Sequence, residues 1–206
     1  MSVTEQLKIH PRTSALIVLD LQRIIVEGEA GPPTAAEKEA LLSRNARLIA
    51  GARSAGMRVI YVRNGFRKGY PEVSSRNKAF SSIRERDRFP DDAEGSQIHP
   101  AVAPHPDDVV ITKHRVSAFY GTELDMILRA NGIDTLVLAG IASSRVVLST
   151  LRYAADADYS LFVAHDCCSD SDPDVHDLLV KKVFVRAGMV LSADEILAVL
   201  NGSAKG

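Results

Sequence analysis

Short apolar segments alternate along the chain with longer segments whose apolar residues recur at helical spacing. The apolar segments, which we expect to be strands, cover residues 15–19, 58–62, 108–112, 134–139, 159–164 and 189–191. The helical patterns cover 34–54, 122–130, 144–156, a segment that starts at 171–173, and 193–200. Continuously apolar strands that alternate with helices form a parallel sheet covered on both faces. The pattern predicts a three-layer α/β/α fold with a doubly wound, mostly parallel six-stranded sheet.

One domain is expected to span residues 1–206, with flexible termini at 1–12 and 201–206. The helix over 34–54 has clear limits, because Thr34 and Glu37 form a capping-box pattern and Gly56 stands where a C-cap belongs. Residues 64–106 lack periodicity, and a loop of that length is usually functional or contains short helices. The charged run at 84–88 within it is expected to be solvated surface, or else an anion clamp.

Composition narrows the class of ligand and the location. The 206 residues include 25 basic and 26 acidic side chains, so the charge offers no basic face for nucleic acid or anionic lipid. No apolar run approaches the roughly 20 residues that cross a bilayer, and residues 1–12 lack the apolar stretch of a signal peptide. The two cysteines, Cys167 and Cys168, are adjacent, which excludes a disulfide framework. We expect a cytoplasmic protein that acts on a small molecule, without nucleic-acid or membrane partners.

Polar residues follow the ends of the predicted strands, where ligands bind in open α/β sheets. Asp20 follows the first strand, Asn64 the second and Lys113 the third. Within ion-pairing distance, the carboxylate and the ammonium keep each other charged, and either can orient a water molecule or exchange a proton. The alternative is that Asp20 caps a loop and Lys113 is a solvated strand end.

The turn after the fourth strand is the most informative feature. Gly140 permits unusual backbone angles, and Ser143 or Ser144 can cap the next helix, whose free N–H groups then form an oxyanion site. An ordinary β-to-α turn that needs a glycine and a cap explains the same residues.

Three segments together resemble the isochorismatase-like (cysteine hydrolase) superfamily, which includes nicotinamidases, carbamoylsarcosine amidases and isochorismatases. They are Leu19-Asp-Leu-Gln22; residues 113–119 with Thr122 and Leu124; and Gly140-Ile-Ala-Ser with residues 146–147, 150–152 and Ala154. The resemblance spans about residues 13–190. It implies that Asp20 is a general acid or base assisted by Lys113. It also implies a cis peptide between Ile141 and Ala142 that shapes an oxyanion site together with Ser143 and Ser144, no cofactor, and a homodimer or homotetramer.

The chain departs from the superfamily at the catalytic cysteine, which lies six residues after the glycine and is Val146 here. An isopropyl group cannot attack a carbonyl, so a thioester cannot form at that position. The first hypothesis is hydrolysis without a covalent intermediate. The isochorismatases of the superfamily lack the cysteine and are understood to cleave a vinyl ether with the aspartate as acid. Val146 would then line the pocket and desolvate Asp20. The isochorismatases usually have a glycine at this position, so the valine narrows the space for the substrate.

Two alternatives stay open. The nucleophile is relocated to Cys167 or Cys168, or to Ser143 or Ser144; or the protein has no hydrolase activity and serves as a binding or assembly protein. For the cysteines the competing interpretation is small buried loop residues beyond the fifth strand, and for the serines it is helix capping.

We expect no catalytic metal. Nicotinamidases bind a divalent ion through an aspartate and histidines after the second strand, and residues 64–70 lack them; His99 and His105 are expected to be exposed turn residues. Arg67 or an arginine of the run at 84–88 could bind a carboxylate through a bidentate pair. The candidates for lining a pocket are Gln22, Asn64, Phe66, Arg67, Phe119 and Tyr120.

Overall fold

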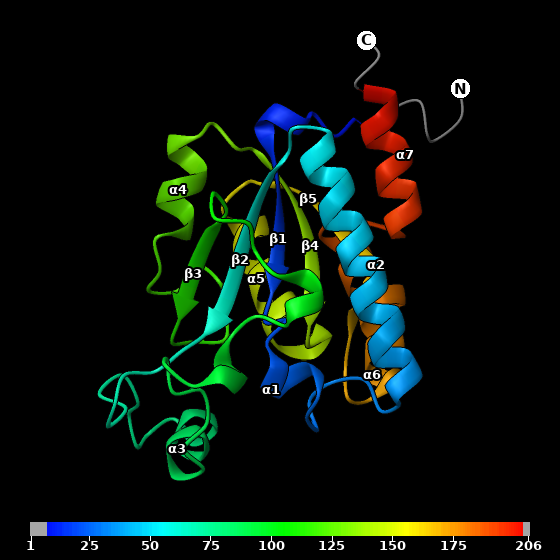
Figure 1. The fold of residues 1–206 in the computed structure, drawn as a ribbon. Helices are drawn as coiled ribbons and strands as arrows, with labels where there is room; N and C mark the ends of the chain where they lie inside the picture. Colours follow the sequence, from blue (N-terminus) through cyan, green and yellow to red (C-terminus); the bar gives the residue numbers. More distant parts are fainter. Residues whose placement is uncertain (1–7, 204–206) are drawn as a thin grey trace.

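The computed structural model describes residues 8–203 and has at its centre a six-stranded parallel sheet (Figure 1). The strands are β1 (Ser14–Leu19), β2 (Arg58–Asn64), β3 (Val109–Lys113), β4 (Thr135–Ile141), β5 (Ser160–Ser169) and β6 (Met189–Leu191). Their order in the sheet is β3-β2-β1-β4-β5-β6, and each neighbouring pair is parallel. The chain builds one half outward from β1 and the other outward from β4. The predicted doubly wound fold is therefore confirmed, with its switch point between β1 and β4.

Helices cover both faces of this sheet. The α-helices of the described residues are α1 (Arg23–Val26), α2 (Ala35–Ser54), α3 (Lys78–Glu85), α4 (Leu124–Ala130), α5 (Leu148–Asp156), α6 (Pro173–Leu178) and α7 (Ala193–Ser203), of which α3 lies beyond the carboxyl ends of the strands. Short π-helical segments cover Ser143–Val147 and Leu179–Val183, and 3-10 turns cover Pro11–Thr13, Glu94–Ser96, Pro100–Val102 and Phe184–Arg186. The long segment between β2 and β3 thus contains short helices, as expected for a loop of its length.

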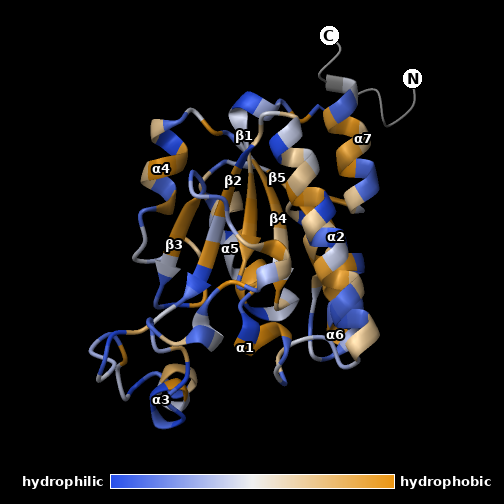
Figure 2. Ribbon diagram, in the orientation of Figure 1, coloured by the Kyte–Doolittle hydropathy of each residue, from blue (hydrophilic) through white to orange (hydrophobic). Residues whose placement is uncertain are grey.

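Alternate side chains of each central strand enter two different hydrophobic cores. Leu16 and Val18 of β1 belong to the core that contains Leu48 of α2, whereas Ile17 and Leu19 belong to the core that contains Leu151 of α5. Figure 1 shows α2 and α7 in front of the sheet and α5 behind it, and Figure 2 shows the apolar strands between these layers. Burial on both faces explains why the strands read as continuous apolar runs.

Two predicted helix starts have the expected caps, whereas neither Ser143 nor Ser144 caps the helix after β4, because its N-cap is Ala142 without a side-chain hydrogen bond. At α2, Thr34 Oγ1 accepts a hydrogen bond from Glu37 N at 3.2 Å and Glu37 Oε2 accepts one from Thr34 N at 3.0 Å. Ser192 and Glu195 form the same reciprocal pair before α7. These bonds satisfy N–H groups that the first turn of a helix leaves without partners.

The fifth strand is longer than the sequence predicted. Its pairing with β4 shifts register between Leu138 and Gly140 and then continues, so that Gly140 pairs with Cys168. Cys167 and Cys168 therefore lie inside β5, and the prediction that they follow the strand was wrong. The polar residues at 165–166 suggested the end of the strand, but they lie at the register shift, and the pairing of β5 with β4 continues after them.

The predicted flexible termini extend partly outside the described residues, which exclude 1–7 and 204–206. Within the described part, Ile9 is fully buried and packs in the core. None of the helices in residues 8–203 combines the length and apolar character of a membrane span.

Candidate active site

The carboxyl ends of β1, β2 and β3 bring Asp20, Asn64 and Lys113 together. These strands are adjacent, and Asn64 is the register partner of Lys113. Asp20 directly follows β1, and its N–H still donates to Val62 O at 2.9 Å. Lys113 Nζ lies 2.9 Å from Asp20 Oδ2, and the two residues are 1% and 4% exposed. They therefore form a buried ion pair at the ligand-binding edge of the sheet, where strand order reverses.

Gln22 holds this pair in place through Asn64. Gln22 Nε2 donates to Asn64 O at 2.8 Å, and Gln22 Oε1 accepts from Asn64 N at 2.8 Å. Asn64 Oδ1 in turn accepts from Lys113 Nζ at 2.8 Å, and Arg115 O accepts from the same amine at 3.1 Å. The ammonium thus contacts three oxygens, which is the full donor capacity of a lysine.

The Asp20 carboxyl has one oxygen without a partner. Burial raises its pKa above the usual range, and the charge of Lys113 opposes that rise. Oδ2 contacts Lys113, whereas Oδ1 is buried and accepts no hydrogen bond in the described part of the chain. A buried acceptor without a donor is costly, and a carboxyl with a perturbed pKa in such a position is typical of a catalytic acid or base. Oδ1 is therefore the oxygen that can exchange a proton with a substrate or a water molecule.

The turn after β4 lies directly against the residue that precedes Asp20. Gly140 has a φ of +133°, and a Cβ added there would lie 1.9 Å from Leu19 O, so no other residue fits without displacing main chain. The peptide bond between Ile141 and Ala142 is cis, as the resemblance implied.

The serines of this turn are engaged by residues that the sequence did not single out. Ser143 is fully buried; its Oγ lies 2.7 Å from His176 Nδ1 and 3.2 Å from Ser169 O. Ser144 donates to Asp170 Oδ2 through both its N–H, at 2.8 Å, and its Oγ, at 2.7 Å. His176 and Asp170 lie 26 or more residues away in sequence, and no local pattern indicates these contacts.

Neither candidate cysteine is an activated nucleophile, and Val146 has no nucleophilic group. Val146 is 1% exposed and packs in the same core as Leu19 and Phe119. Cys167 and Cys168 are 0% and 5% exposed. Burial raises the pKa of Cys168 to about 12 and the pKa of Cys167 above its usual value as well. Thiolates are therefore scarce at neutral pH.

The isochorismatase domain model matches residues 14–195. The chain belongs to the isochorismatase family. It is 35% identical to the isochorismatase family protein YecD of Escherichia coli O157:H7 over 199 residues, which cover 94% of this chain and 100% of YecD. It is 36% identical to ureidoacrylate amidohydrolase RutB of Methylorubrum extorquens strain DM4 over 145 residues, which cover 65% of this chain and 58% of RutB. An isochorismatase family protein from Burkholderia thailandensis has a similar structure, with a TM-score of 0.81, 31% identity, and 94% and 98% of the two chains covered.

The pocket-lining candidates of this isochorismatase-family hydrolase fall into two groups. Gln22, Asn64, Phe66 and Phe119 are buried; Phe66 packs with Tyr70, Phe80 and His114, and Phe119 stacks on Tyr153 with ring centroids 4.6 Å apart. Arg67 and Tyr120 lie at the surface, with 72% of the Arg67 side chain and 65% of Tyr120 exposed, and Arg67 is paired with Glu72. Residues 84–87 of the charged run are also exposed.

No three His, Cys, Asp or Glu side chains in residues 8–203 come together to hold a metal ion. His105 is exposed as predicted. The same prediction for His99 was wrong, because His99 is half-buried and its Nδ1 accepts a hydrogen bond from Ala101 N at 3.2 Å.

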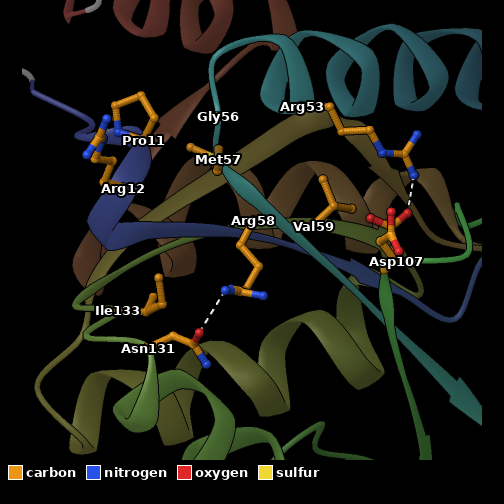
Figure 3. A pocket seen from close by; sticks show the side chains of 11 residues that line it. Pro11, Arg12, Arg53, Gly56, Met57, Arg58, Val59, Asp107, Asn131 and Ile133 are labelled. Atoms are coloured by element: carbon orange, nitrogen blue, oxygen red, sulfur yellow. Dashed lines mark hydrogen bonds and ion pairs between the residues drawn. The ribbon is translucent and has the colours of Figure 1, made fainter.

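Three cavities lie away from the Asp20–Lys113 pair. One of about 380 Å³ is at the amino ends of the strands, opposite Asp20 (Figure 3). Two of its three arginines are engaged: Arg53 pairs with Asp108, and Arg58 Nη2 donates to Asn131 Oδ1 at 2.7 Å. A groove of about 460 Å³ follows residues 115–120 and α5. The third, of about 210 Å³, lies at the carboxyl end of β5.

Proposed function

We propose that this isochorismatase-family hydrolase cleaves a small metabolite without a covalent cysteine intermediate, using Asp20 as general acid or base and Lys113 as its partner. The observation that carries the proposal is the buried Asp20–Lys113 pair, in which one carboxyl oxygen has no partner. The apolar Val146, in the position of the superfamily's nucleophile, supports a mechanism without a thioester. The reaction needs no cofactor.

Asp20 supplies the proton in vinyl-ether hydrolysis. Burial raises its pKa, which makes the protonated form more accessible than in an exposed carboxyl. Oδ1 donates the proton to the alkene carbon, water adds to the resulting oxocarbenium ion, and the hemiketal collapses to a carbonyl compound and an alcohol. The ammonium of Lys113, held by Asn64 and Arg115, stabilises the carboxylate that remains.

A related C–N bond hydrolysis uses the same pair in the opposite sense, and the likeness to RutB, a ureidoacrylate amidohydrolase, favours this second candidate. Asp20 as carboxylate removes a proton from water, which attacks the carbonyl of a small amide or ureide. The developing oxyanion lies at the turn formed by Ile141, Ala142, Ser143 and Ser144. Because the Ser144 N–H already donates to Asp170, we assign the oxyanion contacts to the main chain of Ala142 and Ser143.

Asp20→Asn tests the proposal. A panel of isochorismate-like ethers, amides and ureides is screened for product with the wild-type chain, and the variant is compared by product formation and circular dichroism. We expect the variant to lose turnover by about 10²–10⁴-fold with its fold retained. Unchanged turnover would rule out Asp20 as the acid or base.

The relocated nucleophile and the binding protein are tested in the same screen. The Ser143–His176 contact is the observation that favours relocation to a serine, and full burial of Ser143 opposes it. Loss of turnover in Ser143→Ala or in Cys167→Ser/Cys168→Ser, with Asp20→Asn active, would establish relocation. Specific binding with no product would establish the binding protein.

We also propose a cytoplasmic location and a homodimeric or homotetrameric assembly. The sequence supports the first, and the family resemblance supports the second. Light scattering of the purified chain measures the assembly directly, and a monomer across the micromolar range would contradict it.

A further inference from the structure

The cavity of about 210 Å³ at the carboxyl end of β5, which we call the β5–α6 cavity, has no role in the proposed reaction. Neither Asp20 nor Lys113 lines it. Its walls come from the end of β5, from α6 and from the first turns of α2, all at the edge of the sheet where the strands end (Figure 1). Ligands of open α/β sheets bind at this edge. The polar residues that line the cavity are Glu37, Arg44, His165, Asp166, Asp170 and His176, with Ser169 beside them.

The carboxylates of the cavity already have donors from the protein itself. Glu37 Oε2 accepts from Thr34 N and Oγ1, in the capping box of α2. Asp166 Oδ1 accepts from Ala193 N at 2.8 Å. Asp170 Oδ2 accepts from Ser144 N and Oγ. Each of the three carboxylates thus has a donor from the main chain or a hydroxyl group, and none of them forms an ion pair with a basic residue of the cavity in residues 8–203, although the charge of Asp170 acts on His176.

The basic groups of the cavity, in contrast, retain free donors. Arg44 is half-buried, and its Nε donates to Asp166 O at 2.6 Å, but its two Nη atoms have no partner in residues 8–203. Ser143 Oγ donates to Ser169 O, so His176 Nδ1 is the donor in its contact with Ser143 Oγ. His176 Nε2 can therefore donate to an anion as the imidazolium, and His165 makes no hydrogen bond in the same residues. A half-buried guanidinium without a carboxylate is a binding group for planar or tetrahedral oxyanions.

Two of the lining residues also hold the candidate oxyanion turn. His176 contacts Ser143 at 2.7 Å, and Asp170 accepts both hydrogen bonds of Ser144. These serines directly follow the Ile141–Ala142 peptide bond. A ligand that bonds to His176 Nε2 is thus connected to the turn through the imidazole ring of His176, which contacts Ser143 Oγ.

We propose that the β5–α6 cavity binds a small oxyanion, with Arg44 as the bidentate donor and His165 and His176 as further donors, and that occupancy is transmitted to the turn after β4 through Ser143. Inorganic phosphate and a short carboxylate share the required chemistry. Phosphate offers more acceptor oxygens to the three donor groups, so it binds more tightly than acetate. The site does not depend on the Asp20 mechanism.

Titration of the full chain with sodium phosphate, and separately with sodium acetate, at constant ionic strength tests the site. Binding is read from the imidazole signals of His165 and His176 in ¹H–¹³C NMR spectra. We expect saturable shifts of both histidines. Burial lowers the pKa of His176, and its charged neighbours are Asp177, Asp170, His165 and Lys181; a bound anion raises that pKa. The amide signals of Ser143 and Ser144 should follow the same saturation curve.

Arg47 provides a matched control for Arg44. Both lie on α2, but Arg47 pairs with Asp194 at 2.9 Å and does not line the cavity. We expect Arg44→Gln to weaken phosphate binding about tenfold or more and Arg47→Gln to leave it unchanged. Arg44→Lys keeps the charge and should give an intermediate loss, which serves as the test if the glutamine variant does not fold.

Three results would overturn the proposal. These are non-saturable histidine shifts, equal weakening by Arg44→Gln and Arg47→Gln, and histidine shifts without any change at Ser143 and Ser144. Because no readout uses turnover, these results are independent of whether Asp20 is catalytic.

Discussion

Replacing Lys113 by methionine should remove the charge that compensates the buried Asp20 carboxylate. Lys113 is 1% exposed, and its Nζ lies 2.9 Å from Asp20 Oδ2, 2.8 Å from Asn64 Oδ1 and 3.1 Å from Arg115 O. Removing one partner of a buried ion pair costs about 3–5 kcal/mol, because the other charge stays buried. Methionine replaces most of the lysine stem, so we attribute this loss of unfolding free energy to the orphaned polar groups.

The loss should depend on pH in a defined direction. The Lys113 charge lowers the pKa of Asp20 against the effect of burial, so the pKa rises further in Lys113→Met. A carboxyl whose folded-state pKa exceeds its unfolded value keeps its full contribution to stability below the unfolded pKa and loses it as pH rises through the folded pKa. The variant is therefore least stable, relative to wild type, at neutral pH, and the difference shrinks as pH falls toward about 4.

Urea denaturation followed by circular dichroism at pH 7 and pH 5 measures this difference. With an m value of about 2 kcal/mol/M, the expected loss lowers the urea midpoint by about 1.5–2.5 M at pH 7. The double variant Asp20→Asn/Lys113→Met removes both charges of the pair and should be more stable than Lys113→Met alone. An equal midpoint in wild type and Lys113→Met, a pH-independent loss, or a double variant less stable than the single one would each refute the reasoning.

Three shorter predictions address the rest of the site. Gln22→Met should lower the free energy of unfolding by about 2–4 kcal/mol, because Asn64 N and Asn64 O lose their bonds to Gln22. It should also shift the acidic limb of the pH–rate profile. A profile identical to that of wild type would show that Gln22 does not act on the ion pair. Gly140→Ala should prevent or strongly impair folding, because its Cβ meets Leu19 O, whereas Gly132→Ala, with nothing within 4 Å, should cost about 1–2 kcal/mol in thermal or urea unfolding. Cys168 should resist iodoacetamide at pH 8 in the native chain and react after unfolding, as mass spectrometry can show, because burial raises its thiol pKa to about 12.

Most of the fold could be predicted because each strand carries its own signal. The apolar runs at 15–19 and 134–139 are short and bounded by turn residues, and they became β1 and β4 with small changes at their ends. The α2 capping box depends on two residues that are three positions apart, so it is local and readable. The carboxyl ends of parallel strands lie at the same edge of a sheet, and for that reason Asp20 and Lys113 could be expected at one edge.

The contacts that complete the site could not be predicted, because each depends on tertiary placement. Gln22 contacts Asn64 across 42 residues, and Ser143 contacts His176 across 33. The extension of β5 depends on a register irregularity opposite Ala139, and polar residues at 165–166 gave the opposite impression. The sequence indicated the edge of the sheet at which the candidate residues lie, but not which donor bonds to which acceptor.

The close approach of Gly140 to Leu19 has a consequence for how this family can change its chemistry. Asp20 and the turn are joined main chain to main chain, with Gly140 as the register partner of Leu19, so their separation is set by the sheet and not by any side chain at position 146. A chain can exchange the residue at position 146 while Asp20 and the turn keep their distance. The residue at position 146 can therefore vary while the positions of Asp20, Lys113 and the glycine turn stay the same.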